Sequence, residues 1–93
     1  PLSGAVIGNL SPALADELSM PPDLSGVVVI GLKRRGYARR AGLKPRDIIR
    51  AINGDTIKTV ETLGRVLARQ SGAPAWRISL ERKGRLITLA IGG

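Results

Sequence analysis

The chain lacks cysteine and histidine altogether, and phenylalanine is also absent from its 93 residues. Without cysteine it has no disulfide, thiol nucleophile or thiolate metal ligand, so the fold must be held together by packing. Without histidine it lacks the commonest general base and the commonest metal ligand. Trp76 and Tyr37 are the only aromatic residues, and the predicted core is therefore aliphatic.

These absences argue against catalysis by this chain. A hydrolytic triad needs a base, and none of the serines has a histidine to serve it. A serine–lysine pair is formally possible, but each lysine lies in a polar, turn-like segment where nothing would activate it. The seven acidic residues are scattered and show no metal-ligand spacing. We predict no catalytic residue, no metal site and no cofactor.

Long hydrophobic runs are also missing. No apolar run approaches the ~20 residues that span a bilayer, and no signal peptide is visible. The chain begins with Pro1 rather than Met, so we expect a fragment of a longer protein. Its length is that of one ordinary domain, and we expect residues 1–93 to form a single domain.

Positive charge, in contrast, is abundant. The formal net charge is +8, and eight of the fifteen basic residues lie between Lys33 and Arg50, where only Asp47 opposes them. Such a segment can attract nucleic acid, anionic lipid or an acidic partner, or it can simply be a solvated surface. It has no series of aromatic residues on which bases would stack, and we expect no nucleic-acid partner.

Turn and cap signals divide the chain into about six strands and two main helices. Twelve glycines and six prolines favour such a strand-rich fold. We expect strands at 4–9, 26–32, 47–52, 56–58, 77–81 and 86–91, with turns at Asn53-Gly54 and Lys83-Gly84. We expect helices at 13–18 after the N-cap Ser11 and Pro12, at 37–41 before Gly42, and at 60–69 after the N-cap Thr59.

These elements predict an α+β fold that is mainly β, a small and partly open β-barrel or sandwich capped by two helices. The alternation and helical spacing of apolar residues predict which side chains are buried. The expected core residues are Val28, Ile30, Ile48, Ile52, Leu63, Val66, Leu80 and Leu89.

Three spaced motifs, GVVV at 26–29, YARRAGLKPRDII at 37–49 and ING at 52–54, resemble the signature of PDZ domains. The element order resembles the circularly permuted, bacterial type. Residues 2–5 and 9–15 are similar to the C-terminal (second) PDZ domain of HtrA/DegP-like periplasmic serine proteases. One departure is Arg46, which stands where the family usually has glycine, so we expect an unusual backbone angle or a different turn there.

The resemblance implies that an extended, apolar peptide with a free C-terminus adds as a strand to the edge formed by Ala5, Val6 and Ile7. The preceding loop, Leu2-Ser3-Gly4-Ala5, would aim amides at the peptide carboxylate, and a side chain at Gly4 would obstruct them. The alternative for Gly4 is an ordinary glycine at the start of a strand.

The opposite wall of the implied groove is the helix 60–69, where Val60, Gly64 and Leu67 share one face. Val60 and Leu67 predict apolar ligand residues. Gly64 either makes room for a bulky ligand side chain or is merely tolerated at a cost of ~1 kcal/mol. The implied peptide-binding residues are Leu2, Ser3, Gly4, Ala5, Val6, Ile7, Val60, Gly64 and Leu67.

At the level of function, the resemblance implies a peptide-binding module of a periplasmic serine endopeptidase, used for substrate recognition or regulation. Its partners would be C-terminal or extended segments of unfolded or partner proteins, and other domains or protomers of the parent protease. Three alternatives stay open: an assembly module with an unused or self-occupied groove, a PDZ domain of another bacterial protease or secretion protein, and an electrostatic surface binder using residues 33–50.

Overall fold

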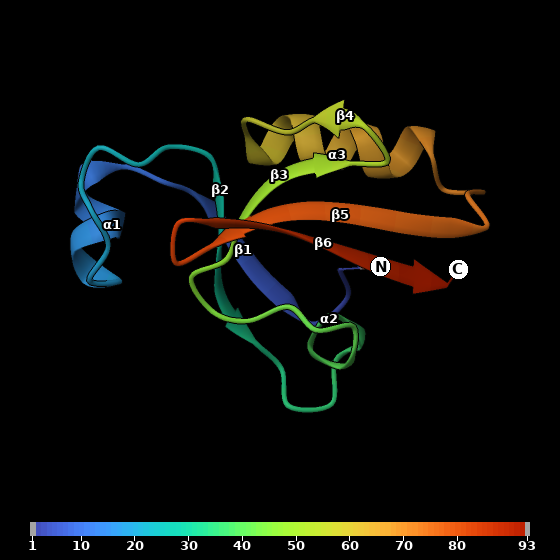
Figure 1. Cartoon of the computed structure of the whole chain (residues 1–93), viewed down its shortest axis with the longest axis horizontal. Coiled ribbons are helices and arrows are strands. Elements are labelled where there is room, and N and C mark those ends of the chain that lie inside the picture. Colours follow the sequence, from blue (N-terminus) through green and yellow to red (C-terminus); the bar gives the residue numbers. More distant parts are fainter. Residues whose placement is uncertain (1, 93) are drawn as a thin grey trace.

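Six strands form one open antiparallel sheet in the computed structural model, which describes residues 2–92 (Figure 1). The strands are β1 (Ala5–Asn9), β2 (Val27–Leu32), β3 (Ile48–Ile52), β4 (Asp55–Thr56), β5 (Ala75–Arg82) and β6 (Arg85–Gly92). The helices are α1 (Pro12–Glu17), α2 (Tyr37–Arg40) and α3 (Val60–Arg69). The strand order is β1-β2-β3-β5-β6, and β4 pairs with β3 beside this path. The edge strands are thus β1 and β6, and the expected mainly β fold is confirmed.

The helices begin where the caps predict. The Ser11 hydroxyl oxygen accepts a hydrogen bond from the Leu14 amide at 3.2 Å, and the Thr59 hydroxyl oxygen accepts one from the Thr62 amide at 3.1 Å. Such bonds satisfy amides that a helix start would otherwise leave unpaired. Within residues 2–92, no helix has the length and apolar character that crossing a bilayer requires.

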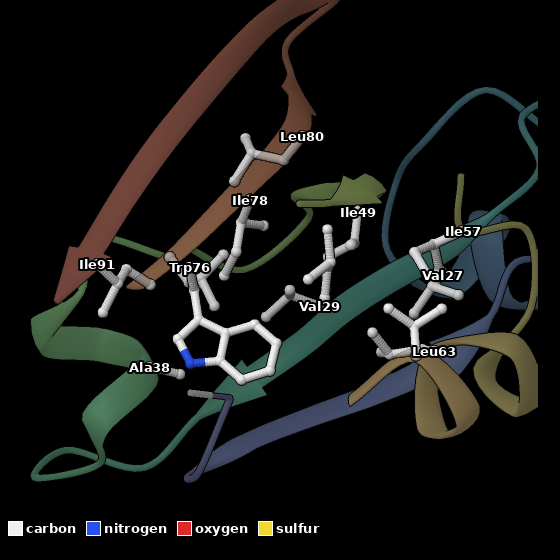
Figure 2. Packing of buried hydrophobic residues seen from close by; sticks show 13 residues of the cluster. Val27, Val29, Ala38, Ile49, Ile57, Leu63, Trp76, Ile78, Leu80 and Ile91 are labelled. Atoms are coloured by element: carbon white, nitrogen blue, oxygen red, sulfur yellow. The ribbon is translucent and has the colours of Figure 1, made fainter. Parts of the chain in front are cut away.

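The main core lies on one face of the sheet. Trp76 of β5 and Ala38 of α2 lie at one end of this cluster. Leu63 of α3 lies at the other end, beside Val27 (Figure 2). The predicted burial of Leu63, Val66, Ile52 and Leu80 is confirmed, and Leu89 packs against the cluster as a half-buried residue. The core therefore joins β1, β2, β3, β5, β6 and the helices α2 and α3.

Three expected core residues lie on the other face of the sheet. Val27 and Val29 point into the main cluster, so the intervening Val28 and the next even residue, Ile30, point away from it. Val28 and Ile48 are nevertheless fully buried. A Cβ placed on Gly8 would lie 3.0 Å from Ile30 and 3.5 Å from Leu14 of α1, which places α1 over this second face. The predicted burial of Val28 and Ile48 is thus confirmed, and Ile30 is half-buried, because β2 is covered on both faces.

A buried ion pair connects β5 to the loop before β3. Asp47 is completely buried, and its carboxylate accepts hydrogen bonds from Arg82 Nε and Arg82 NH2, each at 2.8 Å. It also accepts one from the Lys44 amide at 2.8 Å. The hydrogen bond with Asp47 raises the pKa of Arg82 above its ordinary value. Arg82 therefore stays cationic wherever the protein is folded, and Asp47 always has its counter-charge.

Arg46 has the unusual backbone angle that its position predicts. Its φ is 75°, a left-handed conformation that costs a side-chain-bearing residue about 1–2 kcal/mol. Two hydrogen bonds oppose this cost: the Arg46 amide donates to the Val29 carbonyl at 2.7 Å, and Arg46 Nε donates to the Leu18 carbonyl at 2.8 Å. The side chain therefore ties the end of α1 to the loop before β3.

Replacing Asp47 with alanine should lower the free energy of unfolding by about 3 kcal/mol, because the Arg82 guanidinium then stays half-buried without its partner. Urea unfolding followed by Trp76 fluorescence measures this change. Arg69→Gln is the control, since its ion pair with Asp55 is exposed and should contribute less than about 1 kcal/mol. Equal effects of the two substitutions would contradict this assignment.

Candidate functional site

The edge strand β1 turns half of its backbone hydrogen-bonding groups outward. Just beyond its two ends, the Gly4 carbonyl accepts from the Lys33 amide at 2.8 Å, and the Leu10 amide donates to the Gly26 carbonyl at 2.8 Å. Ladder bonds alternate along an antiparallel strand, so the even-numbered residues face β2. The N–H and C=O of Ile7 therefore face the open edge. The register shift after Val6 does not alter this, because its extra residue lies on β2.

The loop before β1 presents backbone amides at the start of this edge. The Ala5 amide donates to the Leu2 carbonyl at 3.0 Å and closes a tight turn. The Ser3 carbonyl accepts from the Ala38 amide of α2 at 2.9 Å. Within residues 2–92, the amides of Ser3 and Gly4 donate no hydrogen bond. The Ser3 and Gly4 amides of the expected loop are therefore available to an anion, and that of Ala5 is used within the turn.

Gly4 has a structural reason to be glycine. Its φ is +90°, and a Cβ at this position would lie 2.7 Å from the Cα of Gly36. No side chain fits there, because two segments of backbone pass each other at this point. The same contact holds the loop against the turn that precedes α2.

The helix α3 forms a wall beside this edge. Val60 and Leu67 are half-buried and pack against the main core, as do Ala5 and Ile7 of β1. Gly64 is exposed, and a Cβ added to it would meet nothing within 4 Å. The structure thus brings together the expected apolar residues of both walls and leaves open space at Gly64.

Val6 differs from its two neighbours on β1. Its backbone faces β2 by the alternation described above, and its side chain is 53% exposed. Its side chain lies on the sheet face opposite to Ala5 and Ile7, which pack on the core. Val6 therefore belongs to the outer face of the edge strand, not to the apolar groove.

Asn9 is a site residue that the sequence did not suggest. Its side-chain oxygen accepts a hydrogen bond from the Val60 amide at 2.8 Å, joining the end of β1 to the first turn of α3. The two residues are 51 positions apart in the chain, so no local pattern relates them. This bond sets the position of α3 at one end of the groove, opposite to the amide loop.

The remaining surface shows a hollow away from this groove. It is lined by residues that include Met20, Leu24, Ile48 and Lys83, and none of the predicted site residues contributes to it. Among residues 2–92, no three acidic side chains converge into a possible metal site. The candidate site thus consists of an open strand edge, two amides without a hydrogen-bond acceptor in the described part of the chain and the apolar face of a helix beside them.

Comparisons with known proteins agree with this geometry. A family model described as "PDZ domain" matches residues 28–82. The chain is 30% identical over 91 residues to a probable periplasmic serine endoprotease DegP-like of Halomonas elongata, which is 96% of this chain and 19% of that protein. It is also 30% identical over 64 residues to a protein of the same description from Chlamydia pneumoniae, covering 69% of this chain and 13% of that one.

Solved structures show the same similarity. The HtrA-type protease AlgW with a decapeptide matches with a TM-score of 0.82 and 29% identity, over 96% of this chain and 27% of that one. The HtrA3 PDZ domain bound to a phage-derived ligand matches with a TM-score of 0.73 and 21% identity, over 96% and 80% of the two chains. This chain therefore spans only a small part of the proteases that it resembles. It matches most of the HtrA3 PDZ domain.

Gly4→Ala should destabilise the fold by more than about 1 kcal/mol, because it adds a Cβ at positive φ where Gly36 already lies. Gly31→Ala is the matched control: a Cβ there meets nothing within 4 Å. Thermal unfolding compares the two variants. Equal melting temperatures would show that the loop can move away from Gly36.

Asn9→Ala should lower the free energy of unfolding by about 1 kcal/mol, the usual effect of removing a capping oxygen. Asn9→Asp keeps an oxygen facing the Val60 amide and should restore most of this loss. Chemical denaturation of the three proteins provides the measurement. A loss of the same size in both variants would mean that the bond to Val60 does not stabilise α3.

Proposed function

Because this chain belongs to the PDZ domain family, we propose that it binds extended peptides by strand addition along β1. The ligand would run antiparallel to β1, with its C-terminal carboxylate at the loop 2–5. Main-chain hydrogen bonds to the outward N–H and C=O of Ile7 would supply much of the affinity. The carboxylate would accept hydrogen bonds from the Ser3 and Gly4 amides, and such charge-assisted bonds are stronger than neutral ones.

The single observation that carries this proposal is the continuity of the open edge with the two unpaired amides. An edge strand alone is a general template for pairing. An edge that begins at two adjacent free amides has a direction, because a carboxylate can be received at one end only. This polarity supports capture of a free C-terminus over an internal segment.

The ligand we propose ends in an apolar residue. The side chain of its last residue would lie on the same sheet face as Ala5, between β1 and α3. Val60 and Leu67 line that wall with aliphatic groups, and the space at Gly64 admits a large side chain. Burial of such a side chain contributes about 1.5–3 kcal/mol.

We further propose that this domain serves a periplasmic serine protease of the HtrA/DegP type, where it recognises substrates or regulates the protease. The similarity to probable periplasmic serine endoproteases and the decapeptide in the AlgW structure support this. A PDZ domain has no catalytic role of its own, so proteolysis would belong to another part of the parent protein. The partners would be unfolded or partner proteins and other domains of that protease.

Fluorescence polarisation with a library of labelled peptides, each with a free C-terminus, tests the proposal. We expect binding by peptides that end in an apolar residue, and a loss of affinity of at least about tenfold when the same peptide is amidated. Equal binding of the amidated peptide would contradict capture of the carboxylate. Failure of every peptide would favour an assembly role within the parent protein.

The strand edge has its own test in Ile7→Pro, which removes one outward donor and no ladder bond to β2. Peptide affinity should fall several-fold while Trp76 fluorescence stays native-like. Leu86→Ala is the control, because Leu86 is 71% exposed on the other edge strand. If Ile7→Pro fails to fold, a peptide N-methylated at the amide facing Ile7 removes the other bond of this pair, in which the ligand amide donates to the Ile7 carbonyl. Undiminished binding of that peptide would exclude strand addition.

A further inference from the structure

The basic segment 33–50 does not form one surface. Arg50 Nε lies 3.0 Å from Glu81 and its NH1 donates to the Ser25 carbonyl, while Arg46 donates to Leu18. Six other cations are exposed and form no ion pair with any residue of the described range 2–92. One of them, Lys44, lies in the loop before β3, and the other five lie between residues 33 and 40. These five, which we call the basic collar, are Lys33, Arg34, Arg35, Arg39 and Arg40.

The basic collar flanks the loop that presents the two free amides. The turn that carries Lys33, Arg34 and Arg35 is joined to this loop in two ways. The Lys33 amide donates to the Gly4 carbonyl, and Gly36 approaches Gly4 closely. The helix α2 of the basic collar is joined to the loop by the bond from the Ala38 amide to the Ser3 carbonyl. In Figure 1, α2 lies beside the first end of β1. The cations therefore surround one end of the groove and not the whole molecule.

The register shows which part of a ligand would meet these charges. Ala5 pairs with Leu32 and Val6 with Gly31, so Lys33 lies on the same sheet face as Val6. The β-carbon of Lys33 is accordingly 3.6 Å from the position of a Cβ on Gly4. A Cβ on Gly31 would meet nothing within 4 Å, so no side chain separates Val6 from Lys33 on this face.

We propose that the basic collar makes this domain selective for C-termini with an acidic penultimate residue. The inference rests on the proposed function, since it assumes a ligand strand beside β1. The last side chain of such a ligand shares the face of Ala5 and enters the apolar groove. The penultimate side chain then shares the face of Val6 and points toward Lys33 and the turn Arg34-Arg35.

Electrostatics favours this ligand over a neutral one. A penultimate carboxylate and the terminal carboxylate place two negative charges at the end that carries the basic collar. Attractions between exposed charges extend over a screening length of about 10 Å at 0.1 M salt, so the attractions of neighbouring cations to the same ligand end add. Such pairs are solvent-exposed and individually modest, and the selectivity should consequently weaken as salt is added.

The experiment compares two labelled peptides that end in the same apolar residue and differ only in Glu or Gln at the penultimate position. We expect the Glu peptide to bind roughly three- to fivefold more tightly at 50 mM salt, and this ratio to approach one at 500 mM. Arg34→Gln/Arg35→Gln and Lys33→Gln should each reduce the ratio. Affinity for the Gln peptide should change by less than about twofold, because the amides and the apolar groove are intact.

The matched control is Lys83→Gln/Arg85→Gln, which removes the same charge as the arginine pair. These residues lie at the β5–β6 turn, whereas Ala90 and Ile91 at the other end of β6 meet α2. The control should keep the full Glu/Gln ratio. An equal loss in the control would overturn the proposal, because net charge and not the basic collar would then set the preference.

The outcomes separate this inference from the proposed function. Equal binding of both peptides with loss on amidation would overturn the acidic preference and leave carboxylate capture standing. If neither peptide binds, both the acidic preference and the proposed capture of a C-terminal carboxylate are overturned. Binding to vesicles containing phosphatidylglycerol without any Glu/Gln difference, lost in Arg34→Gln/Arg35→Gln, would assign the basic collar to an anionic surface and overturn the peptide preference.

Discussion

The strand β1 pairs with a single neighbour, and the groove depends on this constraint. Because ladder bonds alternate, pairing with β2 on one side obliges the backbone of Ile7 to face the other way. An exposed edge is ordinarily a risk for uncontrolled pairing. Here the helix α3 stands beside it, held by the bond from the Val60 amide to Asn9. The open edge is consequently flanked by a helix, which limits the approach of another sheet from that side.

The ends of this open edge are set by two different contacts. At the amide end, the passage of Gly4 against Gly36 and the bond from Ala38 to Ser3 lock the loop onto the turn and helix that carry the basic collar. Position and charge are thus coupled, because the backbone that presents the amides is also bonded to the segment that carries the cations. The buried pair of Asp47 and Arg82 lies elsewhere and stabilises the fold without entering the groove.

Much of the fold followed from patterns within a few residues. The caps Ser11 and Thr59 and the turn at Asn53-Gly54 were predicted, since each depends on the conformational preferences of one short segment. At Arg46 the family pattern left open an unusual backbone angle or a different turn, and the structure has the unusual angle. The burial pattern of β2 was predicted less well. Its side chains are apolar without alternation, so the sequence carried no signal to separate Val28 from Val29. They point to different faces of the sheet, and α3 covers one of these faces while α1 covers the other.

The sequence by itself determined the order and kind of the elements and, through its motifs, the family to which they belong. The tertiary structure decided which distant groups meet: Asn9 with Val60, Ser3 with Ala38, and Arg50 with Glu81 in place of an open cationic surface. The physical reason is the range of the interactions. Caps and turns form between residues that the chain already holds together, whereas a contact across 51 positions depends on how the whole sheet and its helices pack.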